Sequence, residues 1–191
     1  MKKIGRLILL LFFLAVFIAP VAWFINGHME EFKDVTKEKE ETEDIDYESL
    51  GGVSYKIENG VVTITPTNGK YGKLDATSIK KNSSTAPWAD NVNEISQIKV
   101  ASGYKVFLNT DSTGLFYNLK YVKKIDLSGF DARFAENMTS MFEGCENLTN
   151  LDFSSWDTSK LSVTTNMFSG CVNLTEFKAK DSKITSAYNS K

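Results

Sequence analysis

The sequence predicts an α/β solenoid, in which short parallel strands and short helices stack one behind another. A stretch of 26 residues that occurs twice in succession predicts the stack. An Asn59-Gly60 turn between two β-rich runs predicts a small β cap before it. A long uncharged run near the N-terminus predicts a transmembrane helix in front of both.

Composition removes several classes of function. The chain has 191 residues, a net charge of -2, two cysteines and one histidine. A nucleic-acid-binding protein normally carries a basic face, and the slightly negative net charge of this chain does not suggest one. Zinc sites made of several Cys and His ligands, and nucleophile-His-acid triads, need more of these residues than the chain offers. The sequence therefore predicts no enzyme, no cofactor, no metal, no small-molecule substrate and no nucleic-acid partner.

The first 26 residues have the order of a membrane-targeting segment. Lys2, Lys3 and Arg6 precede an uncharged run over 7–25, which as a helix would be roughly 28 Å long and nearly span a bilayer. An uncleaved signal anchor, a cleaved signal peptide and a buried helix all remain open. The one-sided positive charge predicts a single-pass membrane protein with an extracellular C-terminus, or else a secreted protein.

Composition divides the rest of the chain into segments. Residues 27–50 are rich in Glu, Asp and Lys and predict a charged linker, which extends the chain between membrane and domain. The predicted division is 1–6 cytoplasmic, 7–26 anchor or signal, 27–50 linker, 51–98 β cap, 99–182 repeat solenoid and 183–191 tail.

The β cap contains further strand signals after the hairpin. Residues 95–100 alternate apolar and polar side chains, and a β-like run follows over 104–108. Trp88 lies in the loop before them, and we expect it to close the edge of a core rather than bind a ligand.

The repeat copies occupy 125–150 and 151–176, and a third begins at 177 and loses the pattern. Each starts with an alternating strand and continues with apolar residues at helical spacing. Strand plus short helix is the design of a leucine-rich-repeat-like stack, in which neighbouring units bury a shared core. The residues predicted to form that core on the helical stripe are Met141, Phe142, Met167 and Phe168.

The repeat motif resembles that of the BspA-like leucine-rich-repeat surface proteins of bacteria. The resemblance covers about 55–180, and it implies an extracellular solenoid that adheres to host or neighbouring cells. The residues that carry it are Ser140-Met141-Phe142, Gly144-Cys145, Asn147-Leu148-Thr149, Leu151-Asp152, Ser154 and Trp156-Asp157-Thr158-Ser159.

Cys145 and Cys171 fill the same position in consecutive copies. Stacked strands lie about 4.8 Å apart, near the lower end of disulfide Cα distances, so a bridge is one alternative. Leu119 fills this position one copy earlier, so the position accepts an apolar side chain in place of a cysteine. This favours two buried cysteines that form no disulfide.

Four polar residues should point outward together from adjacent strands: Asp126, Ser128, Asp152 and Ser154. Neighbouring Asp side chains repel modestly, and a basic partner, a cation or Lys178 in the next position would relieve this. We therefore predict these four as partner-binding residues, with a solvated ladder as the alternative. Phe130 and Trp156, which follow each strand, are expected to pack at the core edge.

Two functions fit these features. The first is a cell-surface binding or adhesion module that contacts a protein or surface glycan without catalysis. The second is a structural or accessory envelope protein that docks onto a partner or oligomerises through its short repeat array. An open apolar end of the stack, expected where the third copy stops, would favour the second.

Overall fold

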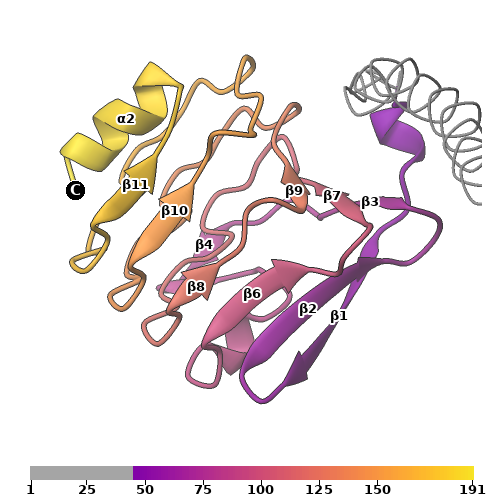
Figure 1. The fold of residues 1–191 in the computed structure, drawn as a ribbon, viewed down its shortest axis with the longest axis horizontal. Helices are drawn as coiled ribbons and strands as arrows, with labels where there is room; N and C mark the ends of the chain where they lie inside the picture. Colours follow the sequence, from indigo (N-terminus) through magenta and orange to yellow (C-terminus); the bar gives the residue numbers. More distant parts are fainter. Residues whose placement is uncertain (1–44) are drawn as a thin grey trace, which may run out of the picture. The chain divides into compact units, whose positions relative to one another are not determined.

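Eleven short strands and one α-helix supply most of the regular structure of the residues that the computed structural model describes, 45–191. Residues Asp46–Lys191 form one unit, shown in Figure 1. The elements are the 3-10 helices η1 (Tyr47–Ser49) and η2 (Ala89–Asn91), the strands β1 (Val53–Glu58), β2 (Val61–Pro66), β3 (Tyr71–Lys73), β4 (Ile79–Lys80), β5 (Ser83–Ser84), β6 (Gln97–Val100), β7 (Lys105–Phe107), β8 (Lys124–Ile125), β9 (Phe130–Asp131), β10 (Asn150–Asp152) and β11 (Glu176–Lys178), and the helix α2 (Ser182–Asn189).

The strands form four small sheets, and the largest is mixed. Its order is β1-β2-β6-β8, with an antiparallel β1–β2 hairpin and parallel pairs after it. The other sheets are parallel β3-β7-β9, parallel β10-β11 and antiparallel β4-β5. The hairpin turns at Asn59 and Gly60 with φ of 50° and 77°, as the Asn-Gly signal predicts. The strands expected over 95–100 and 104–108 are confirmed as β6 and β7.

The predicted solenoid of alternating strands and helices is wrong: this is a small mixed β-sheet domain with a single helix, α2, among its described residues. The expected helical segments are turns. Ser140 and Gly144 have φ of 52° and 76°, which no α-helix accommodates. The Phe142 N–H donates to the carbonyl of Met167 in the next copy, at 2.9 Å, instead of one turn back. Successive tight turns thus place apolar side chains inward at a spacing that imitates a helix.

The predicted transmembrane helix and single-pass location also require correction. Within 45–191, no helix has the length and apolar character needed to cross a bilayer. The segment 7–26, on which the anchor and the secreted alternative both rested, lies outside the described residues.

A column of aromatic rings runs through the core. Trp88 stacks on Phe116 with ring centroids 5.7 Å apart, Phe116 on Phe142 at 5.2 Å, and Phe142 on Phe168 at 5.6 Å. The last three residues are 26 apart in sequence, so the column follows the repeat. The Trp88 indole N–H donates to the Leu115 carbonyl at 3.1 Å, which confirms its place in the core.

The other core predictions are also confirmed. The predicted residues that are buried are Phe130, Met141, Phe142, Trp156, Met167 and Phe168.

Helix α2 covers the end of the stack, where the sequence predicted an open apolar end and a tail. Tyr188 stacks on Phe177 with ring centroids 4.0 Å apart and an interplanar angle of 8°. Ile184 is fully buried beside them. The sequence contains features that predict this helix: Asp181 is an N-cap residue, and Ile184, Ala187 and Tyr188 follow it at helical spacing.

The N-cap of α2 gives a first prediction. The Asp181 carboxylate accepts hydrogen bonds from the N–H groups of Lys183 and Ile184 at 2.7 and 3.1 Å, and from the Thr158 hydroxyl at 3.0 Å. Asp181→Ala should lower the free energy of unfolding by about 0.5–2 kcal/mol, the usual cost of a lost cap. Chemical denaturation measures it. Ser186→Ala, an exposed change on the same helix, is the control, and equal midpoints for both variants would contradict the capping role.

Candidate functional site

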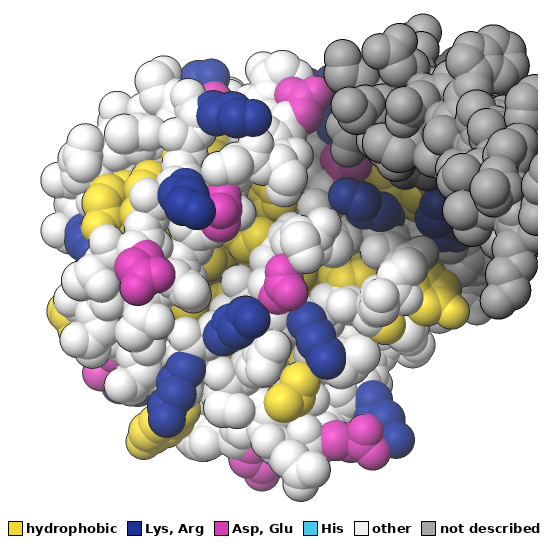
Figure 2. Space-filling model, in the orientation of Figure 1, with side chains coloured by type: hydrophobic (Ala, Val, Ile, Leu, Met, Phe, Trp, Pro, Cys, Tyr) yellow, Lys and Arg dark blue, Asp and Glu magenta, His cyan; other side chains and the backbone are white. Residues whose placement is uncertain are grey.

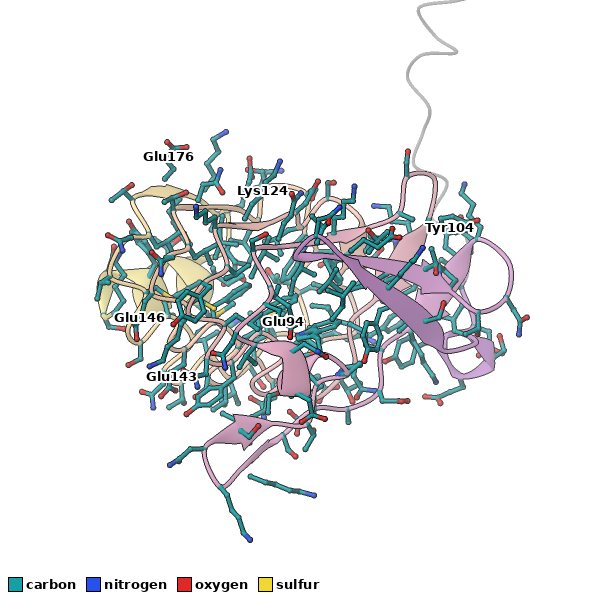
Figure 3. The ribbon with its side chains drawn as sticks, turned by 90° about the horizontal axis from the view of Figure 1, so that it is seen from below. Glu94, Tyr104, Lys124, Glu143, Glu146 and Glu176 are labelled. Carbon is teal, nitrogen blue, oxygen red and sulfur yellow. The ribbon has the colours of Figure 1, made fainter. Side chains whose placement is uncertain are left out.

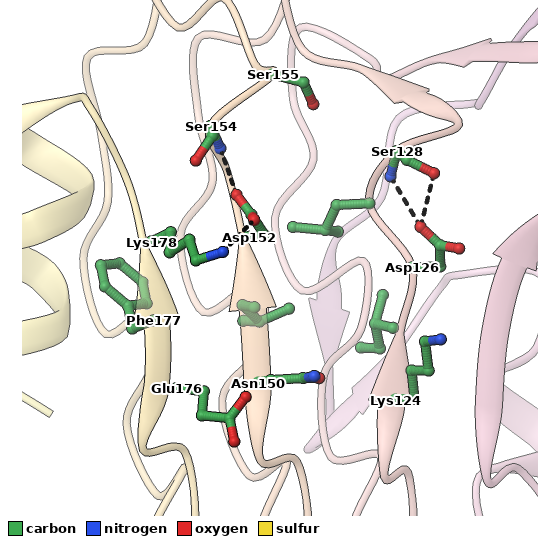
Figure 4. Close-up of a pocket in the computed structure, with 13 residues that line it drawn as sticks. Lys124, Asp126, Ser128, Asn150, Asp152, Ser154, Ser155, Glu176, Phe177 and Lys178 are labelled. Carbon is green, nitrogen blue, oxygen red and sulfur yellow. Dashed lines mark hydrogen bonds and ion pairs between the residues drawn. The ribbon is translucent and has the colours of Figure 1, made fainter.

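A groove of about 700 Å³ lies over the outer face of β8, β10 and β11 (Figure 4). Its walls combine backbone, apolar and charged groups. It is lined by Lys124, Ile125, Asp126, Leu127, Ser128, Asn150, Leu151, Asp152, Ser154, Ser155, Glu176, Phe177 and Lys178. All four residues predicted as partner-binding from the sequence line this groove. Their part in binding remains a prediction.

Two Asp-x-Ser pairs lie where strands of the groove end: Asp126 directly follows β8, and Asp152 is the last residue of β10. The Asp126 carboxylate accepts hydrogen bonds from the backbone N–H of Ser128 at 3.1 Å and from its hydroxyl at 2.7 Å. Asp152 accepts from the backbone N–H of Ser154 at 2.9 Å. This is the local turn that Asp forms with the residue two positions on. Each carboxylate is therefore fixed at the groove by its own strand.

Charges around the groove are balanced within the chain. Lys178 lies 3.3 Å from Asp152, and this ion pair relieves the repulsion expected between Asp152 and Asp126. The pKa of Asp126 is lowered mainly by the hydrogen bond from the Ser128 hydroxyl. The pKa of Asp152 is lowered mainly by Ser154, and Lys178 adds to the effect. Figure 2 shows basic and acidic side chains intermingled over this face, with apolar surface between them.

The Asp126 hydrogen bonds predict a pH effect. Its pKa is lower in the folded protein than its ordinary value of 3.8, so its ionisation stabilises the fold above that pH. This contribution is lost as the pH falls through the lower, folded-state pKa. Ser128→Ala should raise the pKa of Asp126 toward 3.8, as measured by NMR titration of the carboxyl carbon. Ser155→Ala is the matched control, and an unchanged Asp126 pKa in Ser128→Ala would contradict the assignment.

The strand ladder breaks beneath the groove, between β8 and β10. Between β10 and β11, the Glu176 N–H donates to the Thr149 carbonyl at 3.0 Å and the Phe153 N–H to the Lys178 carbonyl at 2.7 Å. The equivalent bonds one copy earlier would join Asn150 to the Lys123 carbonyl and Leu127 to the Asp152 carbonyl. Neither of these two bonds is made, and β8 and β10 are not paired in any sheet of the described residues.

The unpaired groups follow from the alternation of the strands. Residues 149, 151 and 153 direct their backbone groups toward β11, so those of Asn150 and Asp152 face β8. Residues 124 and 126 are turned toward β6, where the Asp126 N–H donates to the Ile98 carbonyl at 2.9 Å. The N–H groups of Ile125 and Leu127 therefore face β10. The N–H groups of Leu127 and Asn150 lack the bonds that their equivalents, Phe153 and Glu176, make one copy later.

The same two copies are tightly joined on their turn side. Backbone hydrogen bonds of 2.8–2.9 Å run from the N–H groups of Met138, Ser140, Phe142 and Gly144 to the carbonyls of Val163, Thr165, Met167 and Ser169, respectively. On the strand side, the Trp156 indole N–H donates to the Leu127 carbonyl at 3.2 Å. The missing backbone bonds between the two copies therefore lie at the strands that line the groove, beside this side-chain bond.

Sequence reasoning missed a second polar row at this site. Lys124, Asn150 and Glu176 are 26 residues apart and line the groove beside the Asp126 row. Figure 3 shows Lys124 and Glu176 on one side of the domain, with Glu143 and Glu146 on the opposite side. The repeat register alone could have identified this row, because positions 26 apart must share a face.

Neither cysteine belongs to the site. Both are buried and free, and their thiols donate to the carbonyls of Phe116 and Phe142 at 3.1 and 3.0 Å. Burial raises the pKa of Cys145 well above its ordinary value and that of Cys171 to about 11. Thiols this weakly acidic are not activated nucleophiles near neutral pH.

Comparisons with known proteins give one match. No curated protein and no solved structure matches the chain. The resemblance to BspA-like proteins gains no support from them and stays a prediction. A family model described as "Mycoplasma protein of unknown function, DUF285" matches residues 80–189, which include the whole groove. Because this match covers more than half of the sequence, the chain belongs to the DUF285 family.

Proposed function

We propose that the protein is a binding module that holds a protein partner in the groove over β8, β10 and β11 by non-covalent contact. The observation that carries the proposal is the break in the strand ladder directly under the groove. The N–H groups of Leu127 and Asn150 lack the cross-strand bonds that their equivalents make one copy later, and the Asp126 and Asp152 carboxylates line the same groove. Unmet backbone groups beside a solvent-filled groove are available to a partner at little cost.

The lining favours a protein over a glycan. Sugar sites commonly present an exposed aromatic face, but the one aromatic side chain in this lining is Phe177, which stacks on Tyr188. The remaining groups are short polar side chains, paired charges and backbone edges. Such a mixture suits a polar protein segment, and it provides no activated group for covalent chemistry.

Association of copies through an open end of the repeat array is the weaker alternative. Such association would need an exposed apolar surface at the C-terminal end of the repeats, where the third copy loses the pattern. Helix α2 fills this place, with Ile184 buried and Tyr188 stacked on Phe177. The groove is therefore the better candidate for a contact surface.

Matched charge reversals test the proposal. The full chain and its variants would be photo-crosslinked in cell extract and the captured proteins quantified. Asp126→Lys combined with Asp152→Lys should reduce capture of the true partner at least tenfold, because two cations then stand beside Lys178. Glu143→Lys, on the opposite side, should leave capture unchanged. If the double variant does not fold, Lys124→Glu with Glu176→Lys replaces it. Capture of the same proteins by groove and control variants would refute the proposal.

A further inference from the structure

We infer that the protein partner of the groove is a second copy of this chain, which docks face to face across a two-fold axis. This inference rests on the proposed function and adds the identity of the partner. It is carried by the charge pattern of the face that β8, β10 and β11 present, because that pattern is complementary to itself.

Four charged side chains mark the corners of this face (Figure 4). Lys124 and Asp126 lie on its β8 side, two residues apart. Glu176 and Lys178 lie on β11, also two residues apart. Two repeat periods separate Lys124 from Glu176, so these two residues share a row across β10. The same spacing places Asp126 and Lys178 in the second row. Positive and negative charges therefore alternate around the corners.

A two-fold axis in the plane of the face brings opposite charges together. Such an axis exchanges neighbouring corners between the copies, and neighbouring corners carry opposite signs. With the axis along the strands, Lys124 faces Glu176 of the partner subunit. With the axis across the strands, Lys124 faces Asp126 of the partner subunit. An isologous interface makes each contact twice, so each of these attractions occurs twice.

The alternation favours a second copy over a partner with charges of a single sign. Lys124 and Lys178 are positive, and Asp126 and Glu176 are negative. A uniformly acidic or basic surface would be repelled by two corners while it is attracted by the other two. A second copy presents the matching alternation in its own groove, at the same spacing.

The corner charges are available to a second copy. Lys124 and Glu176 are exposed, and neither forms an ion pair among residues 45–191. Lys178 lies 3.3 Å from Asp152, but the two side chains are 74% and 54% exposed. Exposed ion pairs contribute little to stability, so Lys178 can exchange this contact for a carboxylate of the partner at little cost.

The middle of the face leaves space for water between the two copies. Asn150, Asp152 and Ser154 come from or directly follow β10, and their side chains are shorter than those of lysine and glutamate. The longer corner side chains therefore meet first, and the hollow between them separates the two Asp152 carboxylates. Bridging waters in such a space are compatible with a stable interface.

Co-purification of two differently tagged copies of the full chain tests the inference. Both copies would be expressed together, and the fraction of the second that co-purifies with the first would be measured. Lys124→Glu in both copies should lower this fraction at least tenfold, because like charges then meet twice in each dimer. Glu143→Lys in both copies is the control on the opposite side of the domain and should leave the fraction unchanged.

Mixed pairs of variants restore the complementarity and identify the axis. If the axis runs along the strands, Lys124→Glu in one copy and Glu176→Lys in the other should co-purify, although neither variant associates with itself. If the axis runs across the strands, Lys124→Glu with Asp126→Lys should behave in this way instead. Restored association in either mixture also shows that the variants are folded.

Three outcomes would overturn the inference. They are native copies that do not co-purify, co-purification that Lys124→Glu leaves unchanged, and failure of both mixtures to restore what Lys124→Glu removes. The proposed function is judged separately, by the capture of proteins from cell extract. Capture of a different protein through the groove would keep the proposed function while self-association fails.

Discussion

Phe142→Ala should lower the free energy of unfolding by about 3–5 kcal/mol, the usual cost of removing a buried phenylalanine. Phe142 is fully buried and contacts the rings of Phe116 and Phe168, above and below it, and that of Phe153 at its edge. No neighbour can collapse into the space without breaking the column. Because domains are typically stable by about 5–15 kcal/mol, the variant would be close to unfolding.

Denaturant titration followed by circular dichroism measures this loss. Val172→Ala is the control, because Val172 belongs to the next copy but is 72% exposed, and it should change stability little. A loss below about 1 kcal/mol for Phe142→Ala would mean that its ring is not in the core.

Gly129→Ala is expected to be the second most damaging change. A Cβ atom at this position would lie 2.4 Å from the Cβ of Val100, which is too close for any side-chain rotation to relieve. The backbone cannot easily retreat, because the Gly129 carbonyl accepts a hydrogen bond from the Val106 N–H at 3.0 Å. Overpacking of this kind costs about 1–3 kcal/mol and occasionally more.

Gly52→Ala is the matched control for that substitution. A Cβ atom there meets no atom within 4 Å, and the residue does not have a positive φ. The two thermal midpoints would be compared directly. Equal midpoints would contradict the close approach of Gly129 to Val100.

Local and periodic patterns predicted the parts of the fold that depend on them. Asn59-Gly60 identified the hairpin because few residues accept two successive positive φ values. The 26-residue period identified the buried column through Phe142 and Phe168, because equivalent positions share an environment. Strand alternation placed Asp126 and Asp152 on one outer face for the same reason.

Other features depended on contacts that the patterns do not specify. Apolar residues at i, i+3 and i+4 predict a helix, yet Ser140 and Asn166 adopt φ of 52° and 55° and turn the same spacing into tight turns. Their backbone bonds run between copies, which periodicity within one copy cannot reveal. The repeat also predicted pairing at every junction, so the gap between β8 and β10 has no signature in the sequence.

Amide hydrogen exchange on the free protein tests the open junction most directly, because it reports each N–H by itself. The N–H groups of Leu127 and Asn150 should exchange much faster than those of Asp126 and Phe153, which donate to carbonyls at 2.9 and 2.7 Å. All four lie in or beside the same strands, so differences in location do not explain a contrast. Equal, strong protection of all four would show a continuous ladder from β8 to β10 and contradict the account.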